Sequence, residues 1–125
     1  MILDTNALSA FVEGDQELLT VLRNRVELAV PVIVLGEYLF GIRQSRVRAK
    51  YENWLAANLD FFDVLATELD TATHYADIRR ELKAAGHPIP SNDIWIAALA
   101  RQHGLPIVSR DRHFRAVKGL HIAAW

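Results

Sequence analysis

The stretch Met1-Ile2-Leu3-Asp4-Thr5-Asn6 governs how the rest of the chain is interpreted. Its apolar run is too short for a helix, and an acid follows at once, before a helical pattern of apolar residues that begins at Ala7. The pattern predicts a short buried strand, followed directly by Asp4 and then by the start of a helix. We therefore expect Asp4 to lie at the carboxyl end of a central strand.

The composition bounds the class of protein. A length of 125 residues predicts a single domain spanning 1–125, and 51% hydrophobic with 23% charged residues is typical of a globular α/β fold. The absence of cysteine excludes disulfides and thiolate metal sites, so we expect a cytoplasmic protein. No apolar run approaches the roughly 20 residues of a membrane helix. The net charge of -1 implies that any nucleic acid is bound by local basic patches.

Short apolar runs alternate with helical patterns along the chain. Such alternation predicts an α/β fold, a three-layer α/β/α sandwich around a short-stranded, mainly parallel sheet, whose active site lies at the carboxyl ends of the strands. Asp15 is the expected N-cap of the second helix. The expected strands are 1–3, 28–30, 61–65, 106–109 and 121–123, and the expected helices are 16–25, 32–44, 43–59, 68–85 and 91–103, with a short helix or turn at 111–117.

Four acids stand where this fold brings strand ends together. Asp4, Asp93 and Asp111 each lie at or near the start of an expected helix, so helix capping alone explains them. Capping does not explain Glu37, which lies within an apolar helix and needs an exposed face, a cation or a metal ion. Four converging carboxylates would raise one another's pKa unless a divalent cation lay between them. Oxygen ligands favour Mg²⁺ or Mn²⁺ over zinc.

Four blocks of the sequence together resemble a known family. They are Ile2-Leu3-Asp4-Thr5-Asn6, Val34-Leu35-Gly36-Glu37-Tyr38-Leu39-Phe40-Gly41, Asn92-Asp93-Ile94-Trp95-Ile96-Ala97-Ala98 and Val108-Ser109-Arg110-Asp111-Arg112-His113-Phe114. These blocks are similar to the signatures of PIN-domain ribonucleases, and their order and spacing resemble those of the VapC toxins of prokaryotic toxin-antitoxin pairs. The resemblance covers essentially the whole chain.

The resemblance implies a PIN-like fold and a metal-dependent endoribonuclease, with RNA as substrate and Mg²⁺ or Mn²⁺ as cofactor. The metal-binding and catalytic quartet would be Asp4, Glu37, Asp93 and Asp111, with Asn6 and Ser109 as polar neighbours. It also implies a homodimer and inhibition by a VapB-type antitoxin that occupies or crosses the acidic cleft. Many members carry an acid where this chain has His113, so the number of metal ions, one or two, stays open.

Two basic groups are candidates for contact with RNA or antitoxin. We expect the basic group that flanks Asp111 to make such contacts. For the second basic group, a solvated helix face is favoured. The spacing of the five histidines indicates no metal site or catalytic triad, so we assign no site role to His113. The group flanking Asp111 is Arg110, Arg112, Arg115 and Lys118, and the other is Arg43, Arg46, Arg48 and Lys50.

Two other classes of function stay open at this point. A phosphatase or phosphotransferase could use Asp4 as a covalent nucleophile, but it would need a second Asp two residues later, where Asn6 stands. A non-catalytic PIN-like module that only binds another protein is compatible with the same fold. Assays of RNA cleavage and of phosphate release separate the three classes.

Overall fold

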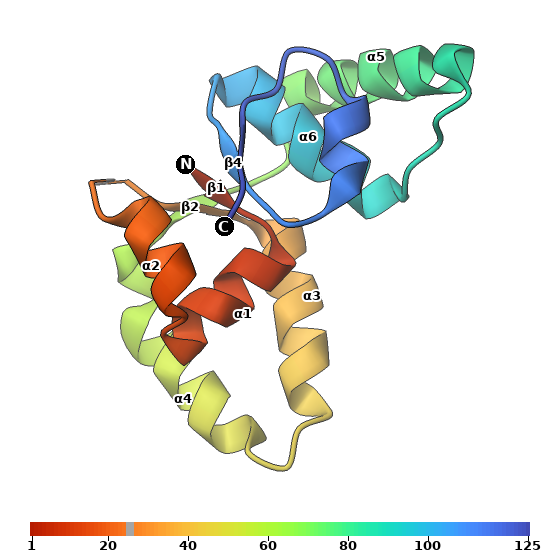
Figure 1. Cartoon of the computed structure of the whole chain (residues 1–125). Helices are drawn as coiled ribbons and strands as arrows, with labels where there is room; N and C mark the ends of the chain where they lie inside the picture. Colours follow the sequence, from red (N-terminus) through yellow and green to blue (C-terminus); the bar gives the residue numbers. More distant parts are fainter. Residues whose placement is uncertain (25–26) are drawn as a thin grey trace.

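The computed structural model describes residues 1–24 and 27–125, which contain a five-stranded parallel sheet (Figure 1). The strand order is β3-β2-β1-β4-β5. The bounds of the strands are Ile2–Leu3 for β1, Ala29–Pro31 for β2, Asp63–Leu65 for β3, Ile107–Val108 for β4 and Ile122–Ala123 for β5.

The first strand is the centre of the sheet, as its sequence predicts. Ile2 pairs with Ala29 of β2 on one side and Ile107 of β4 on the other, and Leu3 pairs with Val108. Ile2 and Leu3 are 0% exposed because helices cover both faces of the sheet. With all the strands parallel, their carboxyl ends meet at a single edge, and Asp4 follows directly at that edge.

Helices form the two outer layers. Figure 1 shows α1 to α4 on one side of the sheet and α5 with α6 on the other. The expected three-layer α/β/α sandwich is therefore confirmed. The helices are α1 (Thr5–Glu13), α2 (Gln16–Leu22), α3 (Val32–Arg43), α4 (Arg48–Asn58), α5 (Leu69–Ala85) and α6 (Ser91–His103), with the 3₁₀ turns η1 (Leu59–Phe61) and η2 (Arg112–Ala116).

Aspartates cap the first two helices in the same way. The carboxylate of Asp4 accepts a hydrogen bond from the backbone N–H of Ala7 at 2.8 Å, and that of Asp15 accepts one from Leu18 at 3.0 Å. The predicted N-cap role of Asp15 is confirmed. Asp4 is also a genuine cap, so a metal-binding role for this residue would come in addition to the structural one.

Several predicted boundaries are wrong. Helix α2 ends at Leu22, and its predicted end at Arg25 lies outside the described residues. Helix α4 begins at Arg48 and not at Arg43, because the chain turns between the two helices. Strand β3 begins at Asp63, since the residues just before it form η1. In the described part of the chain, no helix is both long and apolar enough to cross a membrane.

Candidate metal centre

The strand order brings the four predicted acids to the carboxyl edge of the sheet. Asp4 follows β1, Glu37 lies on the helix that follows β2, and Asp111 lies three residues after β4. Asp93 comes from the first turn of α6, where Pro90 precedes the helix. Asp4 and Asp93 are 4% and 8% exposed, which is unusual for carboxylates and requires compensating partners.

Ser109 links two of the acids. Its hydroxyl donates to Oδ2 of Asp4, and its Oγ accepts a hydrogen bond of 2.9 Å from the backbone N–H of Asp111. Both oxygens of Asp4 are thus engaged, Oδ1 by the Ala7 amide and Oδ2 by Ser109. The arrangement fixes the orientation of the Asp4 carboxylate, and it places Ser109 beside the acids as predicted.

Glu37 is held by two uncharged donors. Thr5 Oγ1 donates to Oε1 at 3.2 Å, and Asn92 Nδ2 donates to Oε2 at 2.9 Å. No cationic side chain of the described residues pairs with Glu37. The carboxylate is therefore oriented without being neutralised, which leaves its charge available to an ion. Thr5 and Asn92 are not among the residues predicted from the sequence, although each adjoins an acid of the quartet along the chain.

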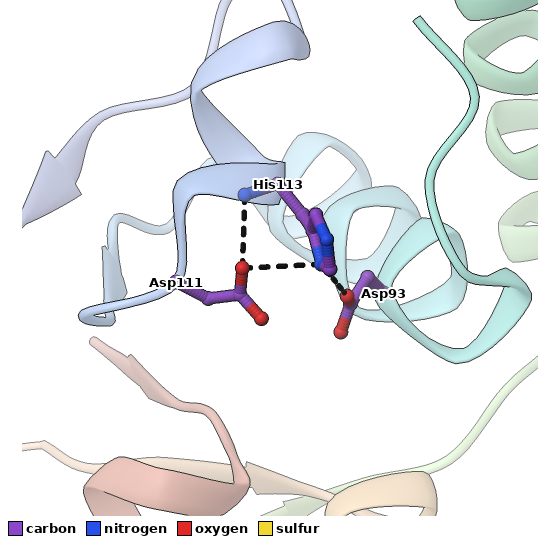
Figure 2. A group of neighbouring side chains, drawn as sticks. All are labelled: Asp93, Asp111 and His113. Carbon is purple, nitrogen blue, oxygen red and sulfur yellow. Dashed lines mark hydrogen bonds and ion pairs between the residues drawn. The ribbon is translucent and has the colours of Figure 1, made fainter.

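His113 joins the two remaining acids (Figure 2). Its Nδ1 lies 2.8 Å from Oδ2 of Asp93 and 3.1 Å from Oδ1 of Asp111, and the backbone N–H of His113 donates to the same Asp111 oxygen at 2.9 Å. One potential ligand atom from each of the three residues lies within 4.8 Å of the others. The spacing of the histidines gives no reason to assign a site role to His113, yet its imidazole lies against both acids. The sequence signal for this contact is the two-residue separation of Asp111 and His113. Asp111 caps η2, and that turn brings the His113 imidazole back over the Asp111 carboxylate.

The pKa values indicate that the acids share one electrostatic environment. Burial raises the pKa of Asp4, and the charges of Asp111 and Asp93 add to the rise against the opposing hydrogen bonds from Ser109 and Ala7. Burial also raises the pKa of Asp93, with further contributions from Asp111 and Glu37. The hydrogen bond to Asp93 raises the pKa of His113, followed by the nearby negative charges. Bringing these carboxylates together is therefore costly without a counter-charge.

Some predicted neighbours have other surroundings. Asn6 is exposed on the first turn of α1, and within the described residues it makes no hydrogen bond to the four acids. Arg110 donates from Nε to the Trp125 carbonyl at 3.1 Å, lies over that indole ring, and pairs with Glu17 at 3.3 Å. Arg43 pairs with Glu52 at 3.6 Å. The side chains of Arg46, Arg112 and Arg115 are exposed.

The donor set fits a hard divalent cation. Potential ligand atoms of Asp93, Asp111 and His113 lie within 4.8 Å of one another, and Asp4 and Glu37 lie close enough for their charges to interact with those acids. Mg²⁺ and Mn²⁺ prefer oxygen ligands, and Mn²⁺ also accepts imidazole. The residues that could hold such an ion are thus Asp4, Glu37, Asp93 and Asp111, with His113 as an additional candidate.

Comparison with known proteins gives a consistent family. The family model described as the PIN domain matches residues 1–120. The chain is 31% identical over 121 residues to the ribonuclease VapC5 of Mycobacterium tuberculosis, covering 94% of this chain and 87% of that protein. It is also 31% identical over 103 residues to the tRNA(fMet)-specific endonuclease VapC of Shigella flexneri, covering 82% and 78%. The DNA-bound VapBC structure from Salmonella typhimurium superposes with a TM-score of 0.88 at 24% identity, covering 99% and 96%. The chain therefore belongs to the PIN-domain family, among the VapC proteins.

Proposed function

We propose that this protein is a Mg²⁺- or Mn²⁺-dependent endoribonuclease that acts in the cytoplasm as the toxin of a toxin-antitoxin pair. The observation that carries the proposal is the convergence of Asp4, Glu37, Asp93 and Asp111 at the carboxyl edge of the sheet. The relatives are named as ribonucleases, which favours RNA as the substrate. The alternatives, a phosphatase and a non-catalytic module, have no observation of their own in their favour.

The residues of the site have distinct tasks in this proposal. Asp4 and Asp93 supply buried negative charge, and Asp111 and Glu37 complete the ligand set. Ser109 holds Asp4 in place, while Thr5 and Asn92 hold Glu37. A bound ion supplies the chemistry of lowering the pKa of a coordinated water and offsetting the charge of the scissile phosphate. No protein nucleophile is needed in this reaction, because the attacking group is the coordinated water.

Removing divalent metal is expected to abolish RNA cleavage. The protein, freed of antitoxin, should cut single-stranded RNA with Mg²⁺ or Mn²⁺, stop in excess EDTA, and recover when metal is restored. The product ends should be a 5′ phosphate and a 3′ hydroxyl, because in the proposed step water attacks the phosphorus and the 3′ oxygen leaves. Gel analysis with labelled RNA measures both points. Cleavage that persists in EDTA contradicts the metal proposal, and phosphate release from a small monoester without RNA cleavage favours the phosphatase.

The second part of the proposal is a VapB-type antitoxin that blocks the acidic cleft. Several structural neighbours are described as VapBC complexes, including one from Rickettsia felis bound to a promoter DNA fragment. A carboxylate cluster of this kind would attract a basic side chain of such a partner. The cognate antitoxin should lower RNA cleavage when titrated against the toxin, with full inhibition at a fixed stoichiometry. Undiminished cleavage with excess antitoxin bound rejects this part of the proposal.

A homodimer is the proposed assembly, and exposed apolar side chains suggest where the copies meet. Leu69, at the start of α5, is 86% exposed, and Phe40 of α3 is 69% exposed. Leu69→Glu is expected to shift the protein from dimer to monomer in light scattering coupled to size exclusion, because it places a charge in an apolar contact. Val47→Glu, at another exposed apolar position outside these two helices, is the matched control and should leave the dimer intact. If the Leu69→Glu protein remains a dimer, the interface does not include Leu69.

A further inference from the structure

A pocket between α5 and α6 is not used by the metal centre. Its volume is about 480 Å³, within the range of ligand-binding cavities. Apolar side chains form its floor and polar or cationic ones its rim, a combination that suits a ligand with both a flat apolar part and a negative charge. Its floor includes Leu82, Ile89 and Ile94, and its rim includes Arg79, Lys83 and Ser91. We name it the α5–α6 pocket, after the two helices that lie side by side in Figure 1.

The cations of the rim are not neutralised. Within residues 1–24 and 27–125, no carboxylate lies within ion-pair distance of Arg79 or Lys83. The two residues are four apart on α5, so they lie on the same face of that helix. Their positive charge therefore faces the opening of the pocket and favours an anionic ligand.

A chain of hydrogen bonds orients a third group at the rim. Arg79 Nη1 donates to the Tyr75 hydroxyl at 3.0 Å, and that hydroxyl lies 2.9 Å from Ser91 Oγ. Either hydroxyl can donate in the bond between Tyr75 and Ser91, and when Tyr75 donates, the Ser91 hydrogen is available to a ligand. The Tyr75 ring stacks on the Trp95 ring with 4.1 Å between their centroids, so ring packing holds the Tyr75 hydroxyl in position.

The pocket adjoins the metal centre through the first turn of α6. Ser91 and Ile94 line the pocket, whereas Asn92 binds Glu37 and Asp93 binds His113. These are consecutive residues, and neighbouring Cα atoms are about 3.8 Å apart. A polymer held at the acids would have to cross this turn of α6 to reach the pocket.

We propose that the α5–α6 pocket holds a nucleotide of the RNA strand next to the cleaved bond. Its phosphate would contact Arg79, Lys83 and the Ser91 hydroxyl, and its base or ribose would pack on the apolar floor. The inference rests on the proposed function in one respect, the choice of RNA as ligand. RNA is favoured over an acidic peptide because the pocket continues from a site proposed to act on a phosphodiester chain.

RNA binding by a charge-neutral pocket variant tests the assignment. The inactive Asp4→Asn chain with Mg²⁺ is compared with the same chain carrying Arg79→Gln and Lys83→Gln, using anisotropy of a labelled single-stranded RNA over a range of salt. Removing the two cations that contact this one phosphate should weaken binding by about tenfold and reduce the slope of log K against log salt by about 0.7. Arg23→Gln with Arg80→Gln removes the same charge from exposed positions, one of them the residue next to Arg79 on α5, and should change binding little.

Each outcome decides the assignment. Equal loss in the pocket and control variants, unchanged binding in the pocket variant, or no RNA binding at all overturns it. Tighter binding of a polyglutamate peptide than of RNA assigns the pocket to a protein partner instead. Cleavage by the chain that retains Asp4 is measured separately. Intact cleavage with unchanged binding rejects the pocket alone, whereas absent cleavage with pocket-dependent binding rejects the nuclease and retains the pocket.

Discussion

The Asp4→Asn variant is expected to lose RNA cleavage by roughly 10²-fold or more while keeping its fold, in line with the effect of removing one preorganised electrostatic group from an active site. Asparagine is as good an N-cap as aspartate, so its side-chain oxygen can still accept from the Ala7 amide. What it removes is the negative charge. The variant therefore separates the capping role of Asp4 from its proposed role as metal ligand, and the measurement is the rate of RNA cleavage at saturating Mn²⁺.

Asp15→Asn is the matched control for this experiment. Asp15 caps α2 through the same kind of hydrogen bond, at 3.0 Å, but it does not belong to the acidic group. Its replacement should leave cleavage unchanged. Asp4→Ala removes the cap as well and should in addition lower the free energy of unfolding by about 1 kcal/mol. Full activity of Asp4→Asn, or an equal loss in Asp15→Asn, contradicts the assignment of Asp4 to the site.

The metal-free protein is expected to become less stable as the pH rises, and Asp4→Asn to be more stable than the wild type at neutral pH. The folded-state pKa of Asp4 is raised above its ordinary value of 3.8, mainly by burial. Its ionisation therefore opposes folding. This penalty is absent below pH 3.8 and grows as the pH rises through the folded-state pKa.

Deprotonation of His113 also lowers the stability of the metal-free protein, in a pH window that begins at 6.5 instead of 3.8. Its pKa is raised above the ordinary 6.5, mainly by the hydrogen bond to Asp93. The stabilisation by protonated His113 is fully present below pH 6.5 and is lost as the pH rises through the folded-state pKa. Deprotonation of His113 thus makes the metal-free protein less stable in base than near pH 6.5, and ionisation of Asp4 makes it less stable above the folded-state pKa of Asp4 than near pH 3.8. Bound metal should offset the penalty of the carboxylates.

Thermal unfolding in EDTA and in Mn²⁺ tests these expectations. In EDTA, the advantage of Asp4→Asn over the wild type in Tm should shrink as the pH falls toward 3.8. Mn²⁺ at about 100 times its Kd should add about 2.7 kcal/mol to wild-type stability and clearly less to the variant. Asp77→Asn, an exposed acid on α5, serves as the charge control and should follow the wild type. An Asp4→Asn variant less stable than the wild type in EDTA at neutral pH contradicts the argument.

Much of the fold follows from local sequence. Ile2 and Leu3 could only form a short buried strand, and Pro31, Gly86 and the Asp15 cap bound their helices near the expected residues, because capping and backbone restrictions act over a few positions. Glu37 stands out because a carboxylate within an apolar helix requires a partner. The four acids can therefore be proposed as a group from the amino-acid sequence, and their role as a metal site stays a prediction.

Short-range patterns thus account for the set of elements, the family resemblance and the identity of the acids. How those acids are held depends on packing between distant segments. Ser109 meets Asp4 across 105 positions of sequence and Asn92 meets Glu37 across 55, through a strand order that no local pattern encodes. The same long-range packing places His113 between Asp93 and Asp111 and engages Arg110 with Trp125. The α5–α6 pocket, by contrast, is lined by residues within 79–94, so its shape depends on how two consecutive helices pack against each other.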